Sequence, residues 1–167
     1  MEKSNNITAK PLQSNACLLD TDVIINWLTQ EVESITGKEL WKACHQIIKL
    51  IEDNKIKGLV SLLHLMEVRF ILGRKKSVDT EKIKSDIKRI LEIIEIIIPD
   101  EIDLLRADGL QIENLLSPCD AVLVSVALSS KEAVVVSRDK NLLNIAAKTL
   151  PAFTPEDFLA KFPNQNR

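Results

Sequence analysis

The chain has 167 residues, a length typical of one globular domain with a full hydrophobic core. Its hydrophobic fraction of 46% and charged fraction of 28% exclude a mainly disordered protein, and no apolar run reaches the ~18 residues that a membrane span needs. The net charge of −2 provides no strong positive field, so any contact with nucleic acid must come from a local patch.

The cysteines and the N-terminus indicate where the protein works. Cys17, Cys44 and Cys119 are far apart and odd in number, and no pair has the C-x-x-C spacing. A zinc site or a disulfide framework is therefore not expected, and a reducing cytoplasm suits the chain better. Residues 1–15 are polar and lack the apolar segment of a signal peptide, so we expect a flexible leader.

The first half of the chain alternates short apolar runs with amphipathic segments. Residues 16–19 are uniformly apolar, which predicts a strand buried on both faces, and apolar residues at helical spacing follow at once. Further elements are expected as a helix over 37–53, a strand over 58–61, a helix over 62–72 that ends at Gly73, and a helix that begins at Asp79 and Thr80.

The second half repeats this alternation. Residues 94–98 predict a strand that Pro99 closes, and residues 133–136 form the clearest strand pattern in the chain. Helices are expected over 101–114, 118–130 and 141–148, followed by an edge strand over 150–153 and a last helix from Thr154. Alternating strands and helices predict an α/β fold in which helices cover both faces of a parallel sheet. We expect one domain over residues 16–162 and a short tail over 163–167.

Acidic residues gather where the predicted strands end. Asp20 closes the first strand, Asp22 follows two residues later, and Asp139 comes soon after the clearest strand. Because open parallel sheets carry their sites at the carboxyl ends of the strands, we expect these side chains to lie close together. Glu67 and Asp120 share helix faces with apolar residues, where an unpaired carboxylate is costly to bury.

Each of these acids also has a purely structural interpretation. Asp20 and Asp139 precede predicted helices and could serve only as N-caps, and Asp22 could complement a helix dipole from the first turn. Glu67 could pair with Arg74, although capping does not explain its position. Four or five carboxylates at one sheet edge would instead supply the hard oxygen ligands that Mg²⁺ or Mn²⁺ prefers.

These acids lie in four short motifs. The motifs are Leu18-Leu19-Asp20-Thr21-Asp22-Val23-Ile24-Ile25, Ser61 to Glu67-Val68, Ser117-Pro118-Cys119-Asp120-Ala121 and Val136-Ser137-Arg138-Asp139-Lys140-Asn141. In this order they resemble the PIN-domain ribonucleases, especially VapC-like toxins of toxin–antitoxin pairs, over about residues 16–158. The resemblance implies a three-layer α/β/α sandwich with a central parallel sheet and Mg²⁺- or Mn²⁺-dependent hydrolysis of RNA phosphodiester bonds.

The resemblance also implies roles for individual residues. The positions of the family's catalytic, metal-binding carboxylates are held here by Asp20, Glu67, Asp120 and Asp139. Supporting positions are held by Asp22, Ser137 and Asn141, the last of these where the family often has another acid. Candidates for contacts with an RNA backbone are the basic residues that follow Glu67, namely Arg69, Arg74, Lys75 and Lys76. A solvated helix end explains this basic group equally well.

Partners and alternatives complete the prediction. The resemblance implies an RNA substrate, a homodimer and an antitoxin protein as a further partner; the helices over 37–53 and 79–93 carry surplus apolar residues for the dimer. An Asp-x-Asp after a buried strand also suits a haloacid-dehalogenase-like phosphatase, although the second acid expected beside Asp139 is missing. A third alternative is a non-catalytic PIN-fold module that binds RNA or protein. His64, one helical turn before Glu67, is interpreted as structural.

Overall fold

The computed structural model describes residues 15–130 and 133–162. The expected leader over 1–15 lies outside these ranges except for Asn15, and the expected tail over 163–167 lies wholly outside them. The division of the chain into leader, domain and tail therefore stays a prediction.

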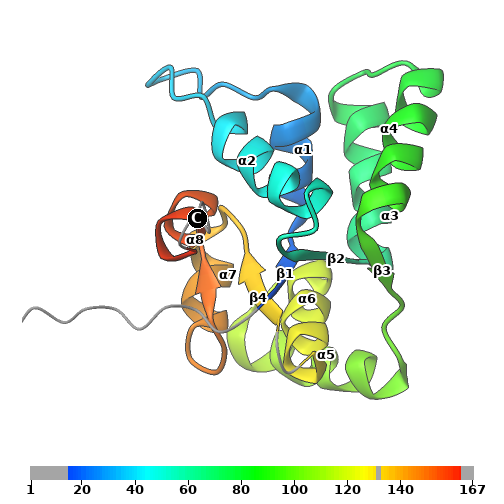
Figure 1. Cartoon of the computed structure of the whole chain (residues 1–167). Coiled ribbons are helices and arrows are strands. Elements are labelled where there is room, and N and C mark those ends of the chain that lie inside the picture. The colour runs from blue at the N-terminus through cyan, green and yellow to red at the C-terminus, as the bar shows by residue number, and fades with distance from the viewer. Residues whose placement is uncertain (1–14, 131–132, 163–167) are drawn as a thin grey trace, which may run out of the picture.

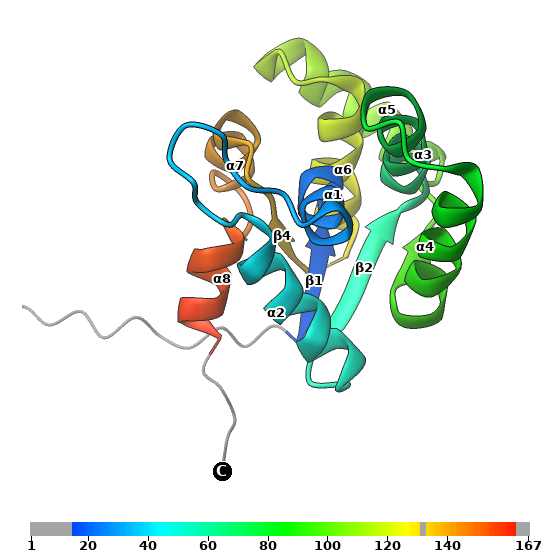
Figure 2. The ribbon, with the colours of Figure 1, turned by 90° about the horizontal axis from the view of Figure 1, so that it is seen from above.

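Five strands form one parallel sheet in the order β3-β2-β1-β4-β5. The strands are β1 (Ala16–Leu19), β2 (Lys57–Ser61), β3 (Glu95–Ile97), β4 (Ala133–Val136) and β5 (Ala152–Phe153). Figure 2 shows β1 in the middle, between β2 and β4. In the register of the sheet, Leu18 stands opposite Leu59 on one side and Val135 on the other. The uniformly apolar β1 is thus the centre of the sheet, as expected for a strand buried on both faces.

Helices cover both faces of this sheet (Figure 1). They are α1 (Thr21–Thr29), α2 (Trp41–Glu52), α3 (Leu62–Phe70), α4 (Thr80–Ile93), α5 (Glu101–Asn114), α6 (Pro118–Ser129), α7 (Lys140–Ala146) and α8 (Pro155–Lys161). One core packs α1, α2, α4 and α8 on the sheet, and a second core packs α6 and α7 on the opposite face. The adjacent residues Cys17 and Leu18 of β1 belong to different cores, one on each face of the sheet. The predicted three-layer α/β/α sandwich is confirmed.

Two predicted helix boundaries are wrong. The second helix begins at Trp41 instead of residue 37, because Val32 and Glu39 pair across an antiparallel bridge around a turn in which Gly37 has φ of 70°. Gly73 does not end the third helix, which continues as a π-helical turn, η1 (Ile71–Lys75). No helix in the described part of the chain is long and apolar enough to cross a membrane.

Candidate functional site

A pocket with a volume of about 430 Å³ lies at the carboxyl end of β1. Its lining includes all the carboxylates predicted from the sequence: Asp20, Asp22, Glu67, Asp120 and Asp139. These residues come from the ends of β1 and β4, from α1, and from α3 and α6. Parallel strands end at the same edge, so the fold brings together acids that are up to 119 positions apart (139 minus 20).

Asp20 is the most buried of these carboxylates, with 6% of the residue exposed. One oxygen, Oδ1, accepts a hydrogen bond from the Thr21 backbone N–H at 2.6 Å, and Oδ2 accepts one from the Ser137 hydroxyl at 2.6 Å. Burial, followed by the neighbouring charge of Asp22, raises the pKa of Asp20 to about 8. The N-cap interpretation is correct, but the same residue also lines the pocket.

Asp22 lies in the first turn of α1 and reaches across to the end of β4. Its Oδ2 accepts a hydrogen bond from the Arg138 backbone N–H at 2.8 Å, and the Ser137 hydroxyl lies 3.4 Å away. Burial raises the pKa of Asp22 to about 6, and the bond from Arg138 opposes this rise. Its other oxygen, Oδ1, is buried and has no hydrogen-bond partner among the described residues. An unpaired buried carboxylate oxygen is costly, so this atom is suited to a cation.

Glu67 is held by a contact that the sequence did not predict. The Thr21 hydroxyl donates a hydrogen bond of 2.6 Å to Glu67 Oε2, and no ion pair joins Glu67 to Arg74 in the described part of the chain. Both Thr21 and Glu67 line the pocket. The only signal for Thr21 was its place between two acids, because the partner lies 46 residues further along the chain.

Asp120 and Asp139 close the remaining side of the pocket from the first turns of two helices. Asp120 accepts a hydrogen bond from the Ser117 hydroxyl at 2.7 Å, and burial raises the pKa of this half-buried carboxyl. Asp139 is the N-cap of α7 and accepts the Leu142 backbone N–H at 3.0 Å. Asn141 is exposed in that first turn and is not among the residues that line the pocket.

Ser137 links the carboxylates that approach the end of β4. Its hydroxyl donates to Asp20, and its oxygen accepts the Asp139 backbone N–H at 2.9 Å. The adjoining Arg138 turns away from the pocket and donates to Glu156 at 2.9 Å and to the Leu40 carbonyl at 2.6 Å. Arg138 thereby ties the strand end to α8 and to the segment before α2, which the sequence gave no means of predicting.

The basic residues are arranged less simply than predicted. Lys76 lines the pocket and forms an ion pair of 2.7 Å with Glu31, a sixth acid in the lining. Arg69, Arg74 and Lys75 are exposed and lie outside the lining. Lys76 is therefore the one residue of this basic group that lines the pocket in the described structure.

The donor set of the pocket fits a hard divalent cation. Carboxylate and hydroxyl oxygens suit Mg²⁺ or Mn²⁺, and a cation would relieve both the orphaned Asp22 oxygen and the repulsion between Asp20 and Asp22. Within residues 15–130 and 133–162, however, no three His, Cys, Asp or Glu side chains already form a metal-binding group. The fit therefore rests on the chemistry of the donors.

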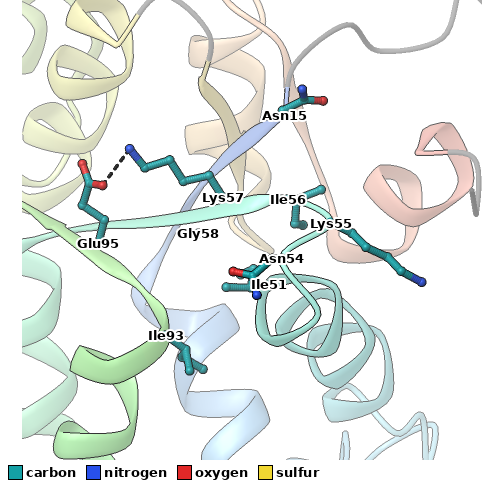
Figure 3. A pocket seen from close by; sticks show the side chains of 9 residues that line it. All are labelled: Asn15, Ile51, Asn54, Lys55, Ile56, Lys57, Gly58, Ile93 and Glu95. Carbon is teal, nitrogen blue, oxygen red and sulfur yellow. Dashed lines mark ion pairs between the residues drawn. The ribbon is translucent and has the colours of Figure 1, made fainter.

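A second pocket lies at the opposite end of the strands (Figure 3). Its lining includes Asn15, Lys55 and Ile56, and its one carboxylate, Glu95, forms an ion pair of 2.6 Å with Lys57. It holds none of the acids predicted from the sequence. The carboxylate pocket is consequently the candidate active site.

Comparison with known proteins gives one family. A family model described as a PIN domain matches residues 16–141. Among solved structures, a toxin–antitoxin complex from Klebsiella pneumoniae is 20% identical with a TM-score of 0.59, and the match covers 83% of this chain and 97% of that one. PAE2754 from Pyrobaculum aerophilum is 21% identical with a TM-score of 0.61 over 96% and 98% of the two chains.

A further similar structure is VapBC2 from Rickettsia felis, bound to a DNA fragment from its promoter. It is 17% identical with a TM-score of 0.63, over 83% of this chain and 98% of that one. At these identities the structural matches support the fold alone. A comparison with curated proteins found no match.

Proposed function

Because the chain belongs to the PIN domain family, we propose that it is a metal-dependent endoribonuclease that hydrolyses RNA phosphodiester bonds. The observation that carries the proposal is the pocket in which carboxylates from separate elements of the fold meet. No histidine, lysine or cysteine there is arranged as a nucleophile: among the described lining residues, Lys76 is paired with Glu31 and neither His nor Cys is present. The lining hydroxyls of Thr21 and Ser117 both donate to carboxylates, and we assign the chemistry to those carboxylates.

In this proposal Asp20, Glu67, Asp120 and Asp139 hold Mg²⁺ or Mn²⁺, and Asp22 and Ser137 support them. When bound, such an ion lowers the pKa of a water ligand and stabilises charge that develops on the phosphate. Ser137 keeps Asp20 oriented, and Thr21 fixes one oxygen of Glu67 so that the other remains available. Second contacts of this kind fix ligand geometry.

Asp120 is the stronger candidate for accepting the proton of the attacking water. Asp120 is half-buried, and Ser117 occupies only one of its oxygens, so the other is available to accept a proton. Asp139, in contrast, is exposed, and its Oδ1 already accepts the Leu142 backbone N–H in the first turn of α7. Lys76 is positioned to meet an RNA phosphate at the rim once its pairing with Glu31 is exchanged for the substrate.

One assay separates this function from its alternatives. Purified protein is given a labelled RNA or p-nitrophenyl phosphate, with Mn²⁺ or with excess chelator, and Asp20→Asn serves as the inactive control. The proposal predicts metal-dependent cleavage within the RNA and no turnover of the monoester. Monoester turnover without RNA cleavage would favour the phosphatase, and the absence of both would favour a non-catalytic binding module.

We further propose that the protein is the toxin of a toxin–antitoxin pair, acts in the cytoplasm, and binds an antitoxin protein. Similar structures come from toxin–antitoxin complexes, and Cys17 and Cys44 are buried free thiols that suit a reducing compartment. We place the antitoxin in a groove beside the active-site pocket. The groove and the pocket share the lining residues Glu31 and Lys76, and the groove is also lined by Leu72. Co-purification with the product of an adjacent small gene, and loss of RNA cleavage in that complex, would test this part.

We still propose a homodimer, but we now place its interface on α5 instead of on the helices expected from the sequence. No large apolar residue of α2 is highly exposed in the described structure, and α4 offers only Leu91 at 51%. The exposed apolar stripe lies instead on α5, where Ile102, Leu105 and Ile112 are 64%, 67% and 73% exposed. Spacings of three and seven residues put these three side chains on one face of the helix. An apolar stripe of this kind supports a symmetric dimer through α5.

A further inference from the structure

A buried histidine lies beside Asp20, one of the carboxylates of the active-site pocket. His64 lies on α3 with 0% of its side chain exposed, and its Nε2 is 3.7 Å from Asp20 Oδ1. That distance is too long for a hydrogen bond in the present arrangement, and Nε2 has no other hydrogen-bond partner among the described residues. A polar atom that is fully buried and unpaired is rare, so this one calls for an explanation.

The other ring nitrogen identifies which atom carries the hydrogen. His64 Nδ1 lies 3.3 Å from the Ser61 hydroxyl oxygen, and that oxygen already accepts the Leu63 backbone N–H at 3.2 Å as the N-cap of α3. Among the described residues, His64 Nδ1 is the acceptor available within hydrogen-bond distance of the Ser61 hydroxyl. If Ser61 donates to Nδ1, a neutral ring must carry its hydrogen on Nε2, where it points toward Asp20.

The opposite arrangement is less favourable. With the hydrogen on Nδ1, the Ser61 hydroxyl would lose its acceptor, and the bare Nε2 would face the Asp20 carboxylate across 3.7 Å. Two acceptors facing each other in a buried space repel once Asp20 is ionised, as it must be when it binds a cation.

We infer that His64 is a positioning residue for the active site: Ser61 fixes its tautomer, and Nε2–H holds Asp20 Oδ1 for cation binding. Asp20 then has donors at both oxygens, Ser137 at Oδ2 and the Thr21 backbone and His64 at Oδ1. A shortening of a few tenths of an ångström would convert the 3.7 Å contact into a hydrogen bond. The part of the inference that concerns cation binding rests on the proposed function; the tautomer does not.

The tautomer can be measured directly. The chain has only two histidines, and the other, His45, is exposed on α2. Long-range ¹H–¹⁵N spectra of the metal-free protein, recorded above the Asp20 pKa of about 8 so that this carboxyl is ionised, therefore contain two ring patterns that His45→Gln assigns. The inference predicts the Nε2–H tautomer for His64 in the wild-type protein and a loss of that preference in Ser61→Ala. An Nδ1–H tautomer in the wild-type protein would overturn it.

Mn²⁺ binding, measured by calorimetry, tests the effect on Asp20. His64→Asn keeps an acceptor for Ser61 but cannot reach Asp20, so its Mn²⁺ affinity should fall on the order of 10- to 100-fold. His64→Gln extends an amide N–H toward Asp20 and should retain most of the affinity, and the exposed control His45→Gln should retain all of it. Metal-free melting midpoints verify that each variant is folded.

The outcomes separate the inference from the proposed function. If His64→Asn binds Mn²⁺ as tightly as the wild type, or if His64→Gln loses as much affinity as His64→Asn, the positioning role is wrong. If the wild-type protein binds no Mn²⁺ at all, the proposed metal-dependent function fails, and the positioning role for cation binding fails with it. The tautomer result then still shows whether Ser61 and His64 are arranged as inferred.

Discussion

Replacing Asp20 by Asn in the metal-free protein should increase stability at neutral pH. Asn keeps the shape and the carbonyl that accepts the Thr21 N–H, and it caps a helix about as well as Asp. The Ser137 hydroxyl can accept from the new amide and turn its hydrogen toward Asp22, which lies 3.4 Å away. The substitution therefore removes the need to take up a proton at Asp20 on folding and leaves few hydrogen bonds unmade.

The magnitude follows from the difference between folded and unfolded pKa. Asp20 has a folded pKa of about 8, against 3.8 for an unperturbed Asp side chain, so the folded state keeps a proton that the unfolded chain releases between these values. The stability that this proton contributes is complete below pH 3.8 and is lost as the pH rises toward 8. The loss is about 1.4 kcal/mol for each pH unit, or at most about 3 kcal/mol between pH 5 and pH 7.

Thermal unfolding at several pH values checks this prediction. The advantage of Asp20→Asn over the wild type should grow steadily from pH 5 to pH 8, by roughly 2–4 °C for each kcal/mol. Asp108→Asn, an exposed acid on α5, is the matched control and should follow the wild type throughout. A lower midpoint for Asp20→Asn, with a difference that does not change with pH, would mean that Asp20 serves only as a cap.

Three further outcomes are expected. Mn²⁺ at about 100 times its Kd should raise the unfolding free energy of the wild type by ~2.7 kcal/mol, and it should raise that of Asp120→Asn by less. Thermal unfolding with and without Mn²⁺ measures both effects, and equal shifts would mean that Asp120 does not bind the cation. Thr21→Val removes the hydrogen bond to Glu67 and should lower the rate of RNA cleavage by roughly 10-fold or more, whereas Thr21→Ser should keep the wild-type rate. Equal cleavage rates for Thr21→Val and the wild type would mean that this bond does not contribute to activity. Leu105→Glu should produce a monomer in light scattering, while Leu91→Glu on α4 should leave the dimer intact, and the reverse result would restore the surface first expected from the sequence.

The sheet and the acidic pocket were predictable because their signals are local. Each strand is a short apolar run, and Asp20 and Asp139 directly follow two of these runs, so the parallel arrangement alone brings them together. Capping and site formation turned out to be compatible, since both residues cap a helix and line the pocket. Helix capping by Asp20 and Asp139 is therefore no argument against their role in the site.

The features that could not be predicted depend on contacts between distant segments. The bond from Thr21 to Glu67 spans 46 positions and that from Arg138 to Leu40 spans 98, and no local pattern indicates either. The end of the third helix was predicted wrongly for a different reason. Gly73 looked like a helix stop, but the left-handed residue that follows the π-helical turn is Ser77, with φ of 52°.

The most direct test of the central claim is the rate of RNA cleavage as Mn²⁺ is returned to protein that has been treated with excess chelator. We predict no cleavage in chelator and recovery as Mn²⁺ is added. Asp120→Asn should lose roughly 100-fold or more of the rate, because the Asp120 carboxylate is proposed to accept the proton of the attacking water. Undiminished cleavage in excess chelator, or a fully active Asp120→Asn protein, would contradict it.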